Sequence, residues 1–167
     1  MTPRIGHRTA SEIPGLDIAE QRSWQNYLTA SLRLYSTLNR RLISAHQLSM
    51  ADLRLLQTLR SNAEMDYRMG DLAAALRALP CRLTRQTRRL EAQGLVQRNI
   101  SPQDRRGVVV AITEAGRQLA AEAMMTYTQN VRSVFLDCLS RAQIKAMKQR
   151  CDRIGTPLAQ PPSPSPR

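Results

Sequence analysis

The sequence has few of the residues on which catalytic and metal sites depend. It contains two histidines, His7 and His46, and three cysteines that lie far apart in the chain, Cys81, Cys138 and Cys151. It has no CxxC pair, no HExxH motif and no carboxylate cluster. Zinc binding, dithiol chemistry and acid–base catalysis therefore have no candidate residues. We expect a protein that is not an enzyme, holds no metal or cofactor, and works in a reducing compartment.

Aromatic residues and long apolar runs are also scarce. One phenylalanine, one tryptophan and four tyrosines fall mostly on helices expected to be buried, whereas RNA-binding modules need exposed rings that stack on bases. No apolar run approaches the ~18 residues of a membrane span. Arg4, His7 and Arg8 interrupt the segment where a signal peptide would be apolar. These absences predict a cytoplasmic protein without membrane contact and make an RNA-binding module the weaker alternative.

Positive charge is what the sequence has in excess. Its 25 lysines and arginines outnumber 13 acidic residues, which gives a formal net charge of +12, and all the basic residues except Lys145 and Lys148 are arginines. Nine arginines fall between residues 77 and 117, where there are three acidic residues. The planar guanidinium, with five donors, suits phosphates and guanine edges. We expect the chain to bind nucleic acid through this segment.

Hydrophobic periodicity divides the chain into a central unit flanked by long helices. Apolar residues recur at helical spacing over residues 17–47 and again over 114–155, with Asp17 and Thr113 as the expected N-caps. The first helix is too long to bury its apolar stripe alone, and Ser140 with Gln143 opens a last helix within the second segment. Residues 1–16 predict a flexible N-terminal arm. Five prolines from Pro157 onwards predict a disordered tail over residues 156–167 that cannot be helical.

The sequence of the central unit, residues 48–113, predicts short helices followed by a hairpin. Ser49 and Asp52 form a capping-box pattern that opens a helix ending near Arg60, and Leu72 lies on a second short helix. A third runs from Pro80 to about Gln93 and stops at Gly94. Two short apolar segments then enclose a charged turn at residues 101–107. The predicted fold is mainly α with a small β-hairpin wing: a winged helix-turn-helix unit with long N- and C-terminal helices.

A helical wheel of residues 80–93 separates a buried side from a cationic one. Leu83 and Leu90 fall on the buried side. An exposed cationic helix fits the major groove of double-stranded DNA, where arginine can bind guanine bidentately. Glu91 is close enough to pair with Arg88 but cannot neutralise the whole face. The expected DNA-contacting residues on this helix are Cys81, Arg82, Thr84, Arg85, Arg88 and Arg89.

The hairpin tip supplies a second expected contact. Asp104 and Arg106 are spaced to pair with one another and so to stiffen the turn. This pairing would leave Arg105 or Arg106 free to enter a minor groove, where narrow A·T tracts concentrate negative potential. A charged tip that directly follows a cationic helix predicts contacts in two adjacent grooves.

Seven short motifs of the chain together are specific to one family. They are Leu48-Ser49-Met50-Ala51-Asp52, Asp71-Leu72-Ala73, Leu83-Thr84-Arg85, Arg89-Leu90-Glu91, Gly94-Leu95-Val96, Asp104-Arg105-Arg106-Gly107 and Thr113-Glu114-Ala115-Gly116. With them the chain resembles the MarR family of winged helix-turn-helix transcriptional regulators. The resemblance implies an obligate homodimer built from the first and last helices, two recognition helices on a pseudo-palindromic operator, and repression released by a small-molecule ligand.

The resemblance also implies a ligand pocket between the dimerisation helices and the winged unit. The candidates to line it are Trp24, Tyr27, Tyr35 and His46, although core packing would explain each of them equally well. Such a pocket would suit an aromatic or phenolic inducer.

The chain departs from the family pattern in its DNA-reading unit. Arg77-Ala78-Leu79-Pro80 stands where the family usually has a small turn residue and a serine cap, and Gln86-Thr87 replaces an apolar pair, which we expect to loosen helix docking. Arg88 replaces a frequent acidic residue. Two further alternatives therefore stay open: an accessory dimer without specific operator recognition, and a redox-responsive regulator that uses Cys81.

Overall fold

The computed structural model describes residues 13–61, 67–100 and 107–159, and for residues 157–159 only the backbone. The order of elements follows the expected one, with the addition of a short first strand. They are α1 (Ile18–His46), α2 (Met50–Ser61), β1 (Tyr67–Arg68), α3 (Met69–Leu76), α4 (Pro80–Ala92), β2 (Val96–Ile100), β3 (Val108–Ile112), α5 (Glu114–Val134), a 3-10 turn (Leu136–Cys138) and α6 (Arg141–Ala159).

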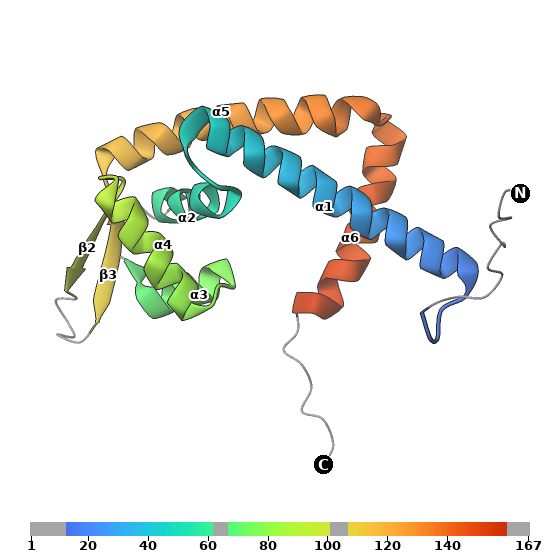
Figure 1. The fold of residues 1–167 in the computed structure, drawn as a ribbon, viewed down its shortest axis with the longest axis horizontal. Coiled ribbons are helices and arrows are strands. Elements are labelled where there is room, and N and C mark those ends of the chain that lie inside the picture. Colours follow the sequence, from blue (N-terminus) through green and yellow to red (C-terminus); the bar gives the residue numbers. More distant parts are fainter. Residues whose placement is uncertain (1–12, 62–66, 101–106, 160–167) are drawn as a thin grey trace, which may run out of the picture.

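Two long helices form the frame of the molecule. Helices α1 and α5 pack against each other (Figure 1). The winged unit, which consists of α2, α3, α4 and the three strands, lies at one end of this pair. Helix α6 and the N-terminal half of α1 extend at the other end. Arg41 ties the two long helices together, since its Nη1 donates to Asn130 Oδ1 at 2.8 Å. The expected fold class, mainly helical with a small winged sheet, is confirmed.

The helices begin where the capping patterns place them. At α1 the Asp17 carboxylate accepts the backbone N–H of Glu20 at 2.8 Å, and the Glu20 carboxylate accepts that of Asp17 at 3.0 Å. At α5 the hydroxyl of Thr113 accepts the N–H of Gly116 at 3.0 Å. These side chains satisfy N–H groups that have no partner within the helix, which fixes each start to within a residue.

Two helix ends depend on left-handed residues. Gly94 adopts a φ of +72° just after α4, as expected. Arg77 has a φ of +50° after α3, in the position where the sequence lacks a glycine. A left-handed conformation costs a non-glycine residue about 1 kcal/mol. The bond from Ala78 N–H to the Ala73 carbonyl, at 2.9 Å, closes the turn in spite of that cost.

The sheet has three antiparallel strands in the order β1-β3-β2, so β3 is central. Val110 of β3 is opposite Arg98 of β2 on one side and Tyr67 of β1 on the other. The expected hairpin is therefore present, but the two-residue strand β1 was missed. The residues of the hairpin tip, 101–106, lie outside the described residues.

The hydrophobic core is built mainly from leucines of the winged unit and closed by α5. Small residues of α5, including Ala120 and Ala123, are fully buried and let the other elements approach that helix closely. Each fully buried leucine contributes roughly 1.5–3 kcal/mol relative to an exposed one. The core leucines are Leu42, Leu48, Leu53, Leu55, Leu56, Leu59, Leu72, Leu76, Leu83, Leu90 and Leu95.

One expectation about the C-terminal segment is wrong. Helix α6 continues through Pro157 to Ala159, whereas the sequence analysis placed a non-helical tail from residue 156. A proline lacks the N–H that would bond the carbonyl four residues earlier, and α6 has only two further residues after it. Residues 160–167 lie outside the described part of the chain. None of the described helices is long and apolar enough to cross a membrane.

Candidate nucleic-acid interface

Helix α4 presents one buried face and one exposed face, as the helical wheel predicts. Leu83 and Leu90 are fully buried, and Thr87 is buried with them. Proline stands at the start of the helix, where its missing N–H costs nothing. The hydroxyl of Thr84 donates to the Pro80 carbonyl at 2.9 Å. This leaves the Thr84 oxygen available only as an acceptor at the edge of the exposed face.

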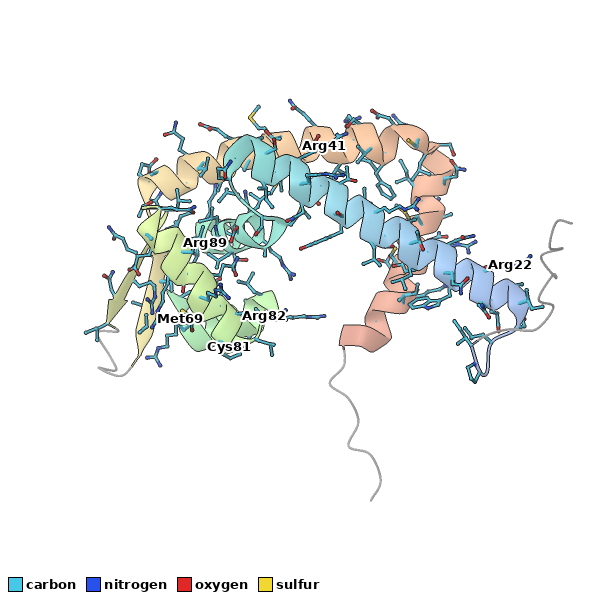
Figure 2. The ribbon with its side chains drawn as sticks, viewed as in Figure 1. Arg22, Arg41, Met69, Cys81, Arg82 and Arg89 are labelled. Carbon is cyan, nitrogen blue, oxygen red and sulfur yellow. The ribbon has the colours of Figure 1, made fainter. Side chains whose placement is uncertain are left out.

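The exposed face of α4 is cationic and unpaired. Arg82, Arg85 and Arg88 are exposed, and none has a hydrogen bond or ion pair to another described residue. They recur every third residue and so form one stripe along the helix. Cys81 is exposed beside them. Figure 2 shows Cys81 and Arg82 at the end of α4 that lies beside α3, and Arg89 toward the opposite end, near α2.

Arg89 differs from the other arginines because it is held by a buried carboxylate. Its Nη2 lies 2.5 Å from Oδ1 of Asp52, while 45 % of the Arg89 side chain remains exposed. Arg89 is among the DNA-contacting residues that the helical wheel predicts, but the sequence pattern does not indicate this ion pair. Arg89 therefore lies at the boundary between the docking face and the exposed face of α4.

Asp52 is the polar centre of the contact between α2 and α4. Only 1 % of the residue is exposed. Its Oδ2 accepts the Ser49 N–H at 2.8 Å and the Ser49 hydroxyl at 2.6 Å. Burial acts to raise the pKa of this carboxyl, but the hydrogen bonds from Ser49, Arg89 and Gln86 outweigh it and hold the pKa below its usual value. Asp52 is therefore ionised at neutral pH.

The Gln86-Thr87 pair is accommodated by polar contacts, one from Gln86 to α2 and one from Thr87 within α4. Gln86 Nε2 donates to Asp52 Oδ1 at 2.9 Å. The buried hydroxyl of Thr87 donates to the Thr84 carbonyl at 3.1 Å, so its burial leaves no donor unsatisfied. The loss of apolar contacts expected from the sequence is thus offset by hydrogen bonds, and Gln86 is a docking residue that sequence reasoning missed.

The wing is joined to α4 by Glu91 and Arg98. Glu91 accepts the backbone N–H of Arg98 at 3.1 Å, and Arg98 Nη1 lies 3.5 Å from the same carboxylate. Glu91 thus pairs with Arg98 of β2 and not with Arg88, which is exposed. The predicted tip residues Asp104, Arg105 and Arg106 lie outside the described residues.

A cleft of about 460 Å³ separates α3 from the wing. Arg98 lines this cleft, and its Nε is buried without a hydrogen-bond partner in the described structure. Thr84 of α4 lies on the same cleft. Its lining residues are Arg68, Met69, Gly70, Asp71, Thr84, Arg98, Gly107 and Val108.

The four residues expected to line a ligand pocket are divided among different places. Tyr35 lines a cleft of about 420 Å³ between the winged unit and the long helices. Tyr27 lines a different cleft. Trp24 packs against Tyr27, and the centroids of the two rings are 6.1 Å apart. His46 ends α1, where its Nε2 lies 2.8 Å from the hydroxyl of Thr126. The structure thus brings Tyr35 alone of the four to the cleft beside the winged unit.

That cleft, here called the inner cleft, has mainly apolar walls and one arginine. Most of its lining cannot be predicted from the sequence because the residues come from five helices and the turn between α3 and α4, and share no motif. Gln86 is the single lining residue from α4. The lining is Tyr35, Met50, Ala51, Leu53, Arg54, Gln57, Leu76, Ala78, Gln86, Met124 and Tyr127.

The second cleft, here called the outer cleft, runs between α1 and α6 and measures about 820 Å³. Tyr27 and Ile154 on its walls are 56 % and 55 % exposed. Other large apolar residues of α1 are also exposed, namely Trp24, Leu28, Leu32 and Tyr35. Large apolar side chains exposed together along one helix often mark a surface that meets a partner.

Comparison with known proteins identifies the winged unit. Residues 48–108 match the model of the MarR family. AbsC, a MarR family transcriptional regulator from Streptomyces coelicolor, is 28 % identical with a TM-score of 0.76, and the match covers 86 % of this chain and 96 % of AbsC. Sco3205, a MarR family transcriptional regulator of the same organism solved in complex with DNA, is 27 % identical with a TM-score of 0.79 over 87 % and 94 % of the two chains.

The fold extends to more distant structures. The transcriptional repressor CouR, bound to a 23-mer DNA duplex, is 23 % identical with a TM-score of 0.72, over 84 % of this chain and 98 % of CouR. No curated protein matches the chain in sequence. Residues 48–108 thus match the MarR family, and over most of its length the chain is similar to two MarR family transcriptional regulators, AbsC and Sco3205.

Proposed function

We propose that the chain is a sequence-specific regulator that binds double-stranded DNA in the cytoplasm with α4 as its recognition helix. The observation that carries the proposal is the stripe of Arg82, Arg85 and Arg88, which is exposed and unpaired within the described structure. At 1.5 Å per residue, the 13 residues of α4 give a helix about 20 Å long. Such a helix fits the major groove, where these arginines and Thr84 reach base edges and phosphates.

The wing and the cleft beside α3 complete the proposed interface. If the wing enters the minor groove and α4 enters the major groove, the DNA backbone between the two grooves lies over this cleft, next to Arg98. Phosphate contacts fix the register of the protein, while base contacts specify the sequence. Arg105 and Arg106 of the wing tip remain our candidates for the minor groove. Sco3205 was solved in complex with DNA and CouR bound to a 23-mer DNA duplex, which supports DNA as the partner of this chain.

We further propose that two copies bind one pseudo-palindromic operator. The outer cleft and the exposed apolar side of α1 give a second copy an apolar surface to bury. Two-fold symmetry would place the recognition helices on half-sites roughly 34–36 Å apart.

A small molecule in the inner cleft is the proposed signal that releases DNA. The apolar walls with Tyr35 suit an aromatic or phenolic molecule, and Arg54 offers one cation for an anionic substituent. Because Gln86 is the single lining residue from α4, a bound molecule would meet the recognition helix at that side chain. Repression follows if DNA binding blocks transcription and the ligand reverses it.

The test is to measure binding to genomic DNA fragments, including the region upstream of the gene that encodes this chain, at several salt concentrations. A specific regulator prefers one palindromic site by about three orders of magnitude or more, and its affinity falls with salt according to the phosphates it neutralises. Equal binding to all fragments would contradict the proposal and favour an accessory dimer. Preference for single-stranded RNA over duplex DNA would favour an RNA-binding module.

A further inference from the structure

Two side chains of the recognition helix converge on one oxygen atom of α2. Gln86 Nε2 and Arg89 Nη2 lie 2.9 Å and 2.5 Å from Asp52 Oδ1. Residues three apart in a helix share a face, so both donors leave α4 in the same direction. The contact thus fixes how far α4 is rotated about its own axis relative to α2.

The carboxylate of Asp52 has no acceptor capacity to spare. Ser49 donates two hydrogen bonds to Oδ2, and Gln86 and Arg89 donate two to Oδ1. A carboxylate has about four lone-pair sites, and all four are occupied. A shift of α4 would leave a buried charge partly unsatisfied, which opposes such a movement.

The same contact determines where the charge of Arg89 can go. One guanidinium nitrogen is held by Asp52, while nearly half of the side chain remains exposed at the edge of the cationic stripe. A guanidinium is planar and carries five donors, so fixing one nitrogen directs the others. Arg82, Arg85 and Arg88 have no such restraint within the described residues.

Resting on the proposed DNA-binding function, we propose that Asp52 is a positioning residue for recognition: it sets the angle of α4 in the groove and fixes the orientation of the Arg89 side chain at the edge of the DNA-facing side. Asp52 itself carries a negative charge close to the DNA-facing side. It therefore cannot raise affinity by charge, and its effect is on the discrimination between sequences.

The test compares wild type with Asp52→Asn, which keeps the size of the side chain and removes its charge. Affinity is measured on two duplexes of equal length and composition, the preferred genomic fragment and a scrambled version of it. We expect binding to the scrambled duplex to stay the same or tighten, because a negative charge is lost. Binding to the preferred duplex should weaken, so that the ratio of the two affinities falls about tenfold or more.

Matched variants separate positioning from general effects. Asp137→Asn makes the same chemical change at an exposed residue of the 3-10 turn and should leave the ratio at its wild-type value. Arg89→Lys keeps the charge but loses the planar fork. As a single variant it should lower the ratio of the two affinities, and in the double variant it should add little to the effect of Asp52→Asn. Full additivity of the two changes would overturn the inference.

The other outcomes are also decisive. If wild type shows no preference between the duplexes, the proposed function fails and this inference fails with it. If wild type discriminates and Asp52→Asn discriminates equally well, the inference alone is wrong. A parallel loss of affinity on both duplexes would assign Asp52 a role in folding only. Should Asp52→Asn not fold, Gln86→Leu breaks the contact from the side of α4, and an unchanged ratio in that variant would overturn the inference.

Discussion

Gly116, in the first turn of α5, packs against the backbone carbonyl of Leu95 at the base of the wing. A Cβ atom at position 116 would lie 2.0 Å from the Leu95 oxygen and 3.0 Å from Ile112 Cγ1. The same carbonyl accepts the N–H of Thr113 at 3.1 Å. The start of α5 and the wing are thus fixed to each other at a point where no side chain fits.

Gly116→Ala should therefore destabilise the protein by about 2 kcal/mol or more, because a methyl group would displace backbone rather than a flexible side chain. Urea unfolding gives the free energy directly. The matched control is Gly155→Ala in α6, where a Cβ meets no atom within 4 Å. There the gain in helix propensity should stabilise the chain by up to about 1 kcal/mol. A Gly116→Ala variant as stable as wild type would show that the wing is not fixed at this contact.

The stability of the contact between α2 and α4 should depend on pH through Asp52. The pKa of this carboxyl lies below its ordinary value of 3.8 in the folded chain, so its stabilising effect is complete above about pH 5. It is lost as pH falls through 3.8 toward the native pKa, since the unfolded chain binds the proton first. Asp52→Asn should cost about 1–3 kcal/mol at pH 7.

The measurement is urea unfolding of wild type and Asp52→Asn at pH 7, 5, 4 and 3.5. The difference between their unfolding free energies should shrink through the last two values. The other carboxylates titrate in both proteins, so their contributions cancel in this difference. A difference that is constant with pH would mean that the ionised carboxylate does not stabilise the fold.

Ile154→Asp should separate the proposed dimer into monomers. Ile154 lies on the outer cleft and is 55 % exposed in the single chain, so a charge there would be buried only when a partner covers it. Sedimentation velocity should show a slower species, and affinity for a two-half-site duplex should fall by at least tenfold. Met125→Asp, at an α5 residue that is 67 % exposed and lines neither named cleft, serves as the control. A dimer that survives Ile154→Asp would place the interface elsewhere.

Phenol and benzoate are suitable probes of the inner cleft. Each should weaken DNA binding and raise the melting temperature of the free protein, because a molecule that binds the folded state stabilises it. Tyr35→Ala should reduce both effects for both probes. Arg54→Gln should reduce them for benzoate more than for phenol, since the carboxylate alone needs a cation. Probes that raise the melting temperature without weakening DNA binding would contradict a role in release.

Features set by neighbouring residues could be predicted from the sequence. Capping patterns at Asp17, Ser49 and Thr113 located the helix starts, and the wheel of α4 identified Leu83 and Leu90 as buried. Both kinds of pattern depend on side chains one helical turn apart, so no knowledge of the distant chain is needed.

Features that depend on residues far apart in the chain could not be predicted from the sequence. Strand β1 is two residues long and exists because Tyr67 and Arg68 pair with β3, some forty residues later. Gln86 appeared to be a lost apolar contact because its acceptor, Asp52, lies 34 residues earlier and is buried. Glu91 likewise pairs with Arg98 across an element boundary. Each of these contacts depends on the completed fold, which periodicity does not contain.

The most direct test of the central claim, that the exposed face of α4 reads DNA sequence, is the base discrimination of Arg85→Ala. Affinities of wild type and variant are measured on the preferred duplex and on a set with one base pair changed at a time. The account predicts that Arg85→Ala loses about 1–3 kcal/mol on the preferred duplex and discriminates less at one symmetric pair of positions, with preference elsewhere retained. A uniform loss across all duplexes, with discrimination intact at every position, would contradict it.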